Sequence, residues 1–310
     1  DVALRCNIVT VSTDELPYEE KTIIDHSSSE ISTEDAAVLL EAVRKELEND
    51  IYKFYVGTSY RHLTIWDKGE VVDLTPPHDV LGQKIGQYLP KDDKLREMMK
   101  KSYDILSNHP INVERMKRGL NPANSLWFWG AGTRPMLTSF EEKTGHKGAM
   151  ISAVDLLKGI AVGAGMKVIE VEGANGGLDT NYEGKADAAV DVLLNGGCDF
   201  AYIHLEAPDE MGHQGSYERK VKAIENLDKR IIKRVVEKME AAGEDFRMLV
   251  LPDHPTPVAI RTHVSDPVPY MLYDSTDKKN NTWSYNEKDG EASGNYIAEG
   301  HTIINRLFEK

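Results

Sequence analysis

The sequence has 310 residues, with 37 lysines and arginines against 51 aspartates and glutamates, which gives a formal net charge of −14 at pH 7. This length is about twice that of a typical ~150-residue domain and predicts one large α/β unit or two domains. An acidic surface repels a phosphate backbone, which argues against general nucleic-acid binding, and no apolar run reaches the roughly 18 residues of a membrane span. Two cysteines, Cys6 and Cys198, are too few for a disulfide framework and favour a reducing cytoplasm.

The first 118 residues have the pattern of a compact α/β module. Pro76 and Pro77 exclude a helix interior or a central strand, so residues 75–79 are expected to form a loop. Apolar periodicity and turn residues predict the other elements. They are a strand at 2–11, a helix at 33–49, strands at 54–56 and 62–66, a hairpin turn at 67–69, and helices at 91–107 and from 111.

After a boundary at 121–124, short apolar strands alternate with helices. The expected strands cover 126–129, 148–152, 167–171, 200–205 and 248–251, and the expected helices cover 153–164, 183–195 and 216–241. This alternation predicts a mainly parallel sheet covered by helices on both faces. Ligands of such sheets lie beyond the carboxyl ends of the strands. The apolar stripe Ile224, Leu227, Ile231 and Val235 is expected to pack in the core.

Carboxylates and imidazoles follow these strand ends. Asp209 and His213 come after the strand at 200–205, Asp253 and His254 come after the strand at 248–251, and His263 lies in a proline-stiffened loop. A single Asp–His pair at a strand end is more often a hydrogen-bonded loop than a metal site. Three such positions in one half of the chain favour a centre for Mn²⁺, Zn²⁺, Fe²⁺ or Co²⁺ and predict most of a two-metal site.

Other polar and glycine-rich stretches have more than one interpretation. His204 and Glu206 alternate within the strand, either as a buried hydrogen-bonded pair or as groups that orient metal ligands. The glycines at 130–132 and 173–177 lack complete nucleotide-binding motifs and are expected to form tight turns.

The order of these motifs resembles the alkaline phosphatase superfamily, and within it the cofactor-independent phosphoglycerate mutases of the archaeal type. The resemblance implies an alkaline-phosphatase-like α/β fold, a mainly parallel sheet sandwiched by helices over 119–310, with a smaller inserted substrate-handling α/β domain over 1–118. It also implies an isomerase that interconverts 3-phosphoglycerate and 2-phosphoglycerate, a small phosphorylated sugar acid, through a phosphoserine. The matching stretches are 1–11, 25–36, 59–62, 75–79, 126–130, 147–159 and 207–213.

By the same resemblance, two divalent ions are expected, with Mn²⁺ preferred over Zn²⁺, Co²⁺ and Mg²⁺. One ion would be held by Asp209, His213 and His263, and the second would be completed by Asp253 and His254. Two such ions neutralise the charge that develops in an in-line phosphoryl displacement.

An anionic substrate also requires cations. Arg61 and Arg134 are the expected bidentate groups, Lys147 resembles a phosphate-binding lysine of the family, and Arg5 is a weaker candidate. For each of these residues a surface salt bridge is the alternative.

Two neighbouring residues are candidates for proton transfer. His78 and Asp79 are expected to act on protons of the transferred hydroxyls, or else to anchor their loop.

Two departures from the family pattern matter. In the loop 25–30, Ser29 and Glu30 stand where a glycine and a cation are expected, so a substrate role for this loop is in doubt. The family's nucleophilic serine and one metal-binding aspartate would lie upstream of Asp1, so the chain as it stands is expected to be inactive. The alternatives are another phosphomutase or phosphatase of the superfamily, or a non-catalytic metal-binding relative.

Overall fold

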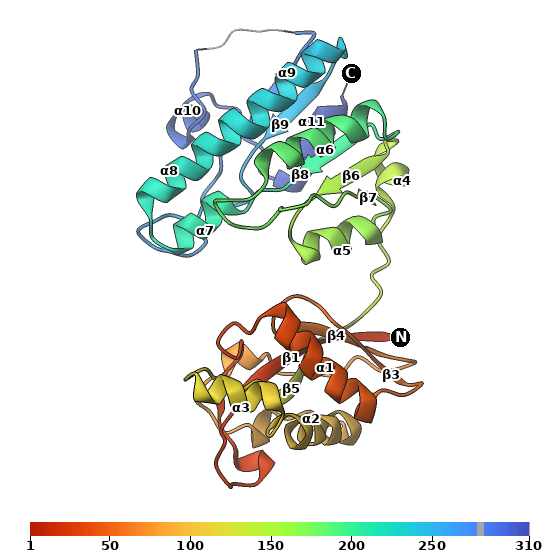
Figure 1. The fold of residues 1–310 in the computed structure, drawn as a ribbon. Helices are drawn as coiled ribbons and strands as arrows, with labels where there is room; N and C mark the ends of the chain where they lie inside the picture. The colour runs from red at the N-terminus through yellow and green to blue at the C-terminus, as the bar shows by residue number, and fades with distance from the viewer. Residues whose placement is uncertain (278–281, 310) are drawn as a thin grey trace. The chain divides into compact units, whose positions relative to one another are not determined.

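The computed structural model describes residues 1–277 and 282–309. The chain divides into two compact units, Asp1–Pro135 and Met136–Lys310 (Figure 1). The division therefore falls after Pro135, and not after residue 118 as expected. The reason is that β5 (Ser125–Thr133) pairs along its length with β1 (Val2–Val11), which ties residues 119–135 to the first unit.

The first unit is built on an antiparallel sheet with β1 at its centre. β1 pairs with β2 (Ile23–Asp25), β4 (Arg61–Trp66) and β5, and β4 also pairs with β3 (Tyr52–Tyr55). The turn at 67–69 is not a hairpin, because residues 67–76 contain no strand and the partners of β4 are β1 and β3. Successive side chains of a strand point to opposite faces, so Leu4, Cys6 and Ile8 all enter the core.

Two helices contribute to this core. α1 (Thr33–Leu47) and α2 (Asp93–Leu106) lie side by side (Figure 1) and bury their apolar stripes with the residues of β1. Both begin at a capping side chain. Ser32 accepts the backbone N–H of Asp35 at 3.2 Å, and Asp92 accepts that of Leu95 at 2.8 Å. A shorter helix, α3 (Pro110–Lys117), completes the unit.

The second unit contains the expected parallel strands. β6 (Gly148–Ile151) pairs in parallel with β7 (Lys167–Val168) and β8 (Phe200–Ile203). β9 (Arg247–Val250) instead pairs antiparallel with β10 (Met271–Asp274), a strand that the sequence did not indicate. The helices are α4 (Phe140–Thr144), α5 (Asp155–Gly163), α6 (Tyr182–Leu194), α7 (Ala207–His213), α8 (Tyr217–Asn226), α9 (Lys233–Ala242), α10 (Glu287–Ala292) and α11 (Ile303–Phe308).

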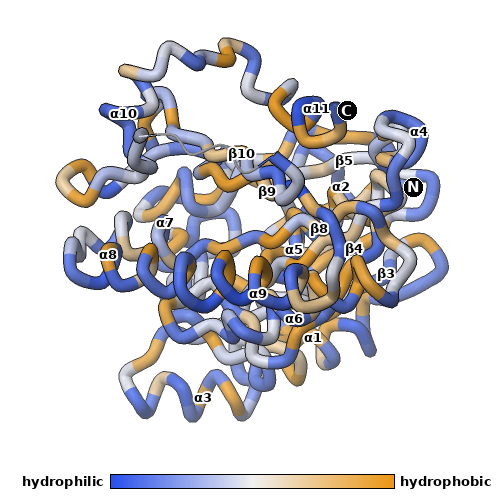
Figure 2. Tube along the Cα trace, turned by 90° about the horizontal axis from the view of Figure 1, so that it is seen from above, coloured by the Kyte–Doolittle hydropathy of each residue, from blue (hydrophilic) through white to orange (hydrophobic). Residues whose placement is uncertain are grey.

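The long helix predicted at 216–241 is present as α8, a π-helical segment (Leu227–Ile232) and α9. Figure 2 shows hydrophilic and hydrophobic stretches alternating along α8 and α9, as expected for helices with one buried side. Ile231 and Val235 are buried against α6, whereas Ile224 is 51% exposed and Leu227 is only half-buried, so the buried part of the predicted stripe begins at Ile231, two turns later than expected. No helix in the described part of the chain is long and apolar enough to cross a membrane.

Candidate metal centre and anion-binding face

Helix α7 carries two of the predicted metal ligands, Asp209 and His213. These two residues, which were expected just after a strand end, lie on α7, where residues four apart occupy the same face. Pro208 is compatible with this helix because it stands in the first turn, where a backbone N–H is not needed. Both side chains therefore point in one direction from a rigid element.

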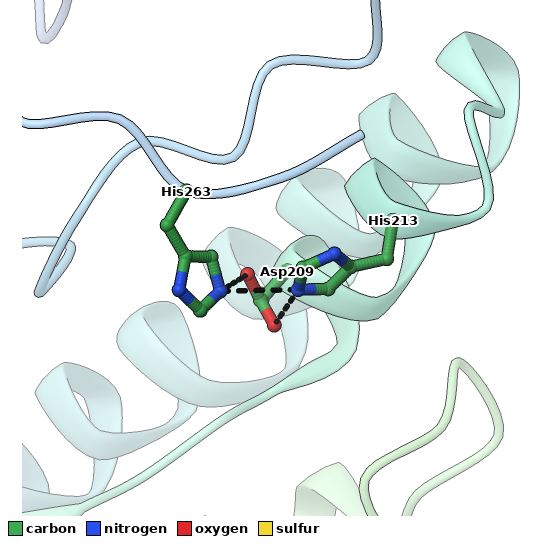
Figure 3. Close-up of side chains that lie close together, drawn as sticks. All are labelled: Asp209, His213 and His263. Atoms are coloured by element: carbon green, nitrogen blue, oxygen red, sulfur yellow. Dashed lines mark hydrogen bonds and ion pairs between the residues drawn. The ribbon is translucent and has the colours of Figure 1, made fainter. Parts of the chain in front are cut away.

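His263, in the loop that follows β9, lies next to Asp209 and His213. Its Nε2 lies 3.2 Å from Asp209 Oδ1 and 3.0 Å from His213 Nε2, which is itself 3.3 Å from Asp209 Oδ2. Ligand atoms of these three residues all lie within 4.8 Å of one another. Figure 3 shows the three side chains pointing toward one another. The structure thus brings together three of the five predicted metal ligands.

The protonation of His213 fits a metal ligand. Its Nδ1 lies 3.1 Å from the carbonyl oxygen of Arg261, which can only accept, so Nδ1 carries the hydrogen. Nε2 then presents its lone pair to the carboxylate of Asp209. Two acceptors that face each other repel unless a proton or a cation lies between them. The donor set therefore fits a divalent ion.

Asp253 and His254 lie beside this triad. The ring of His254 is centred 3.7 Å from that of His263, and its Nε2 lies 3.3 Å from Asp253 Oδ2. Asp253 is exposed, and His254 is partly buried. The second predicted pair of ligands is therefore adjacent to the first group.

His204 and Glu206 follow β8 beneath the same site. No hydrogen bond joins their side chains in the described part of the chain, and the nearest polar partner of His204 Nδ1 is Ser152 Oγ at 3.3 Å. Burial lowers the pKa of the His204 imidazole, and burial together with the charge of Glu210 raises the pKa of the Glu206 carboxyl. That these two residues orient the metal ligands stays a prediction.

One buried cation near the site was not predicted from the sequence. Lys185, on α6, is 1% exposed, and its Nζ donates to the carbonyl of His204 at 3.2 Å. Its position on an otherwise apolar helix face would have been the signal, since a lysine there must find an acceptor.

A second group of predicted residues lies on one face of the sheet in the first unit. The register places Arg5 opposite Trp129, and Asn7 opposite Arg61, so all four share a face. The guanidinium carbon of Arg5 lies 4.0 Å from the centre of the Trp129 ring, and that of Arg61 lies 4.5 Å from the Tyr60 ring. Neither arginine forms an ion pair with a described residue. Burial, and then the charge of Arg61, lower the pKa of Arg5.

The stretch 75–79 was expected to be a loop, but its last three residues, Pro77–Asp79, form a 3₁₀ turn that carries the predicted proton-transfer pair to this face. The indole N–H of Trp127 donates to the carbonyl of Thr75 at 2.8 Å and anchors the loop. The ring of His78 then lies 5.2 Å from that of Trp129, and its Nε2 lies 3.7 Å from Asp79 Oδ1.

The discounted loop 25–30 also reaches this face. The ring of His26 lies 5.7 Å from that of Tyr60 and 6.1 Å from that of His78. Asp25 holds the loop by accepting the backbone N–H groups of Ser27 at 2.8 Å and Ser29 at 2.6 Å. We call Arg5, Arg61, Trp129, Tyr60, His26 and His78 the basic face.

Two predicted substrate residues lie elsewhere within their own units. Arg134 is exposed just beyond β5, at the end of the sheet where β4 finishes, whereas Arg61 begins β4. Lys147 is exposed immediately before β6, at the amino end of that strand. The metal ligands follow the carboxyl end of β8, which runs parallel to β6. The structure therefore does not bring Lys147 to the metal centre, because Lys147 lies at the amino ends of the parallel strands and the metal ligands follow their carboxyl ends.

Comparison with known proteins places the chain in a family. Residues 57–299 match the model of the metalloenzyme superfamily, and residues 1–112 match that of 2,3-bisphosphoglycerate-independent phosphoglycerate mutase. Enzymes of that name from Methanosarcina barkeri and Methanosarcina mazei are 50% and 47% identical over 283 residues, which is 90% of this chain and 69% of each relative. The solved structure of the PH0037 protein from Pyrococcus horikoshii matches with a TM-score of 0.74 and 25% identity, covering 99% of this chain and 72% of that one.

The α/β fold and the convergent carboxylate and imidazoles define a member of the metalloenzyme superfamily, a class that binds divalent metal ions. Within that class, the chain belongs to the 2,3-bisphosphoglycerate-independent phosphoglycerate mutases, which are isomerases. The resemblance inferred from the motifs is thereby confirmed.

Proposed function

We propose that this protein interconverts 3-phosphoglycerate and 2-phosphoglycerate, with the metal ligands supplied by the second unit and substrate handling by the first. The observation that carries the proposal is the meeting of Asp209, His213 and His263, with the lone pair of His213 fixed toward Asp209 by the Arg261 carbonyl. A carboxylate with two neutral imidazoles is a donor set for a catalytic divalent ion.

Two ions would complete the centre. Asp209, His213 and His263 would hold one of them, and Asp253 and His254 would contribute to the second. Among divalent metals Mn²⁺ is our first choice, before Zn²⁺, Co²⁺ and Mg²⁺, because the donors mix oxygen and imidazole nitrogen and lack thiolate. When bound, such ions withdraw charge from the oxygens of a phosphoryl group. The chain's own contribution is to hold the donors in place from α7 and from the loop after β9.

The basic face would bind the anionic groups of the substrate. Arg5 and Arg61 have no carboxylate partner among the described residues, and a guanidinium can grip a carboxylate or a phosphate through two parallel hydrogen bonds. His78, beside Asp79, would exchange a proton with a glycerate hydroxyl, since an imidazole nitrogen can accept a proton and return it. The proposal does not require Arg134, which lies at the other end of the sheet from Arg61. The proposal does not require Lys147.

The test is a coupled assay of the protein as its gene encodes it. We expect 3-phosphoglycerate to be converted after chelation and addition of Mn²⁺, and His213→Ala to lose at least about 100-fold in kcat/KM. Isomerisation that persists without metal would overturn the proposal. Hydrolysis of p-nitrophenyl phosphate that exceeds isomerisation would identify a phosphatase of the same superfamily instead.

A further inference from the structure

Thr256 lies between the two groups of predicted metal ligands. It is 3% exposed, in the loop after β9, and its hydroxyl donates a short hydrogen bond to Asp209 Oδ1 on α7. The same oxygen lies 3.3 Å from His254 Nδ1. One side chain thus contacts a ligand of each group.

The hydrogens of this arrangement can be counted. A hydroxyl has one hydrogen, and the carboxylate of Asp209 can only accept, so the hydrogen of Thr256 lies on the bond to Asp209. That bond is charge-assisted and outcompetes donation to a neutral imidazole. The hydroxyl oxygen, 3.3 Å from His254 Nδ1, is then left as an acceptor facing that imidazole. His254 Nε2 lies 3.3 Å from Asp253 Oδ2.

The backbone holds Thr256 in this position. Its carbonyl accepts from Lys220 Nζ at 2.6 Å, which ties the loop to α8. The Lys220 ammonium also lies close enough to interact electrostatically with Asp209. On the other side, the backbone of Gly212 approaches the same carbonyl so closely that an added Cβ would lie 2.4 Å from its oxygen. Thr256 is therefore pressed against α7 next to His213.

We infer that Thr256 is a positioning residue, whose hydroxyl orients the Asp209 carboxylate and holds the imidazole of His254 beside it. The inference rests on the proposed metal centre. Such outer partners are typically worth 10–100-fold in metal affinity.

The test compares Thr256→Val, which keeps the shape and removes the hydroxyl, with Thr256→Ser, which keeps the hydroxyl. Thr262→Val is the matched control, since Thr262 is exposed and adjacent to His263. Mn²⁺ binding is titrated calorimetrically, and circular dichroism verifies folding. We expect Thr256→Val to raise the Kd for Mn²⁺ by about 10–100-fold, and the other two variants to stay within about threefold of the wild type. A Thr256→Val protein that binds Mn²⁺ like the wild type would show that Thr256 only fills space.

A second hydroxyl-free variant keeps the inference testable if Thr256→Val fails to fold. Thr256→Ala should also raise the Kd for Mn²⁺ by about 10–100-fold, and a Thr256→Ala protein that binds Mn²⁺ like the wild type would overturn the inference. Absence of Mn²⁺ binding by the wild type would refute the metal centre itself, which separates that failure from a failure of the role of Thr256.

Discussion

The helix backbone at Gly212 lies directly against the carbonyl oxygen of Thr256, with room for a hydrogen but not for a methyl group. This contact joins α7, which carries Asp209 and His213, to the loop that carries Asp253 and His254. A glycine within a helix lowers its stability by about 0.5–1 kcal/mol relative to alanine. At position 212 the missing side chain is what lets the two groups of predicted ligands lie next to each other.

Gly212→Ala should therefore destabilise the protein and weaken metal binding, although alanine is the better helix former. We expect a loss of about 1–3 kcal/mol in the free energy of unfolding, as for overpacked sites, and a higher Kd for Mn²⁺. The control is Gly159→Ala on α5, where an added Cβ meets nothing within 4 Å. It should be neutral or stabilising, by up to about 1 kcal/mol. Equal effects of the two substitutions would contradict the close approach.

His263→Ala should remove one of the three converging donors. The Kd for Mn²⁺ should rise by more than the 10–100-fold that is typical of outer partners, with little loss of stability, because the side chain is about half exposed. His301→Ala, at another exposed histidine of the same unit, is the control. Calorimetric titration of both variants checks this, and an unchanged Kd for His263→Ala would remove that residue from the metal centre.

The sequence pattern brought Asp209 and His213 together as predicted ligands after a strand end, but it did not place them on a helix. Pro208 and Gly212 are residues that usually end helices, and both are tolerated for local reasons: the proline stands in the first turn and the glycine permits contact with Thr256. The role of Thr256 could not be predicted, because no local pattern shows where a loop folds back onto a helix.

The contacts within the basic face could also be predicted only in part from the sequence. Alternation along β1 and β4 indicates which side chains share a face with Arg5 and with Arg61. That Arg5 lies opposite Trp129 depends on the pairing of strands far apart in the sequence. His26 was missed for a different reason: the loop 25–30 was judged by its departures from a family pattern, whereas Asp25 holds it in place by hydrogen bonds within the loop.

Arg61→Ala should raise the KM for 3-phosphoglycerate by about 10-fold or more, since hydrogen bonds to charged groups contribute about 1.5–3 kcal/mol. Arg61→Lys should recover only part of this loss, because an ammonium cannot form two parallel hydrogen bonds. Arg118→Ala, an exposed arginine of the same unit, is the control. Steady-state kinetics over a range of salt concentrations check the prediction. Equal KM values for Arg61→Ala and the wild type would exclude this residue from substrate binding.

Asp25 should make the first unit sensitive to acid. Although burial opposes it, hydrogen bonds from Ser27, Asn121 and Ser29 lower the pKa of Asp25 to about 2, from an ordinary value of 3.8. Because the folded pKa lies below the unfolded one, the charged carboxylate stabilises the fold above about pH 4. That stabilisation is lost as the pH falls from about 4 to about 2.

Asp25→Asn removes this titration, so the variant should melt at a lower temperature than the wild type at pH 7, and the difference should shrink toward pH 2.5. Asp73→Asn, at an exposed aspartate of the same unit, is the control and should show no such convergence. Thermal melts followed by circular dichroism at pH 7, 4 and 2.5 measure both differences. A gap between Asp25→Asn and the wild type that stays constant over this range would mean that the loop 25–30 is held by contacts that do not depend on the charge of Asp25.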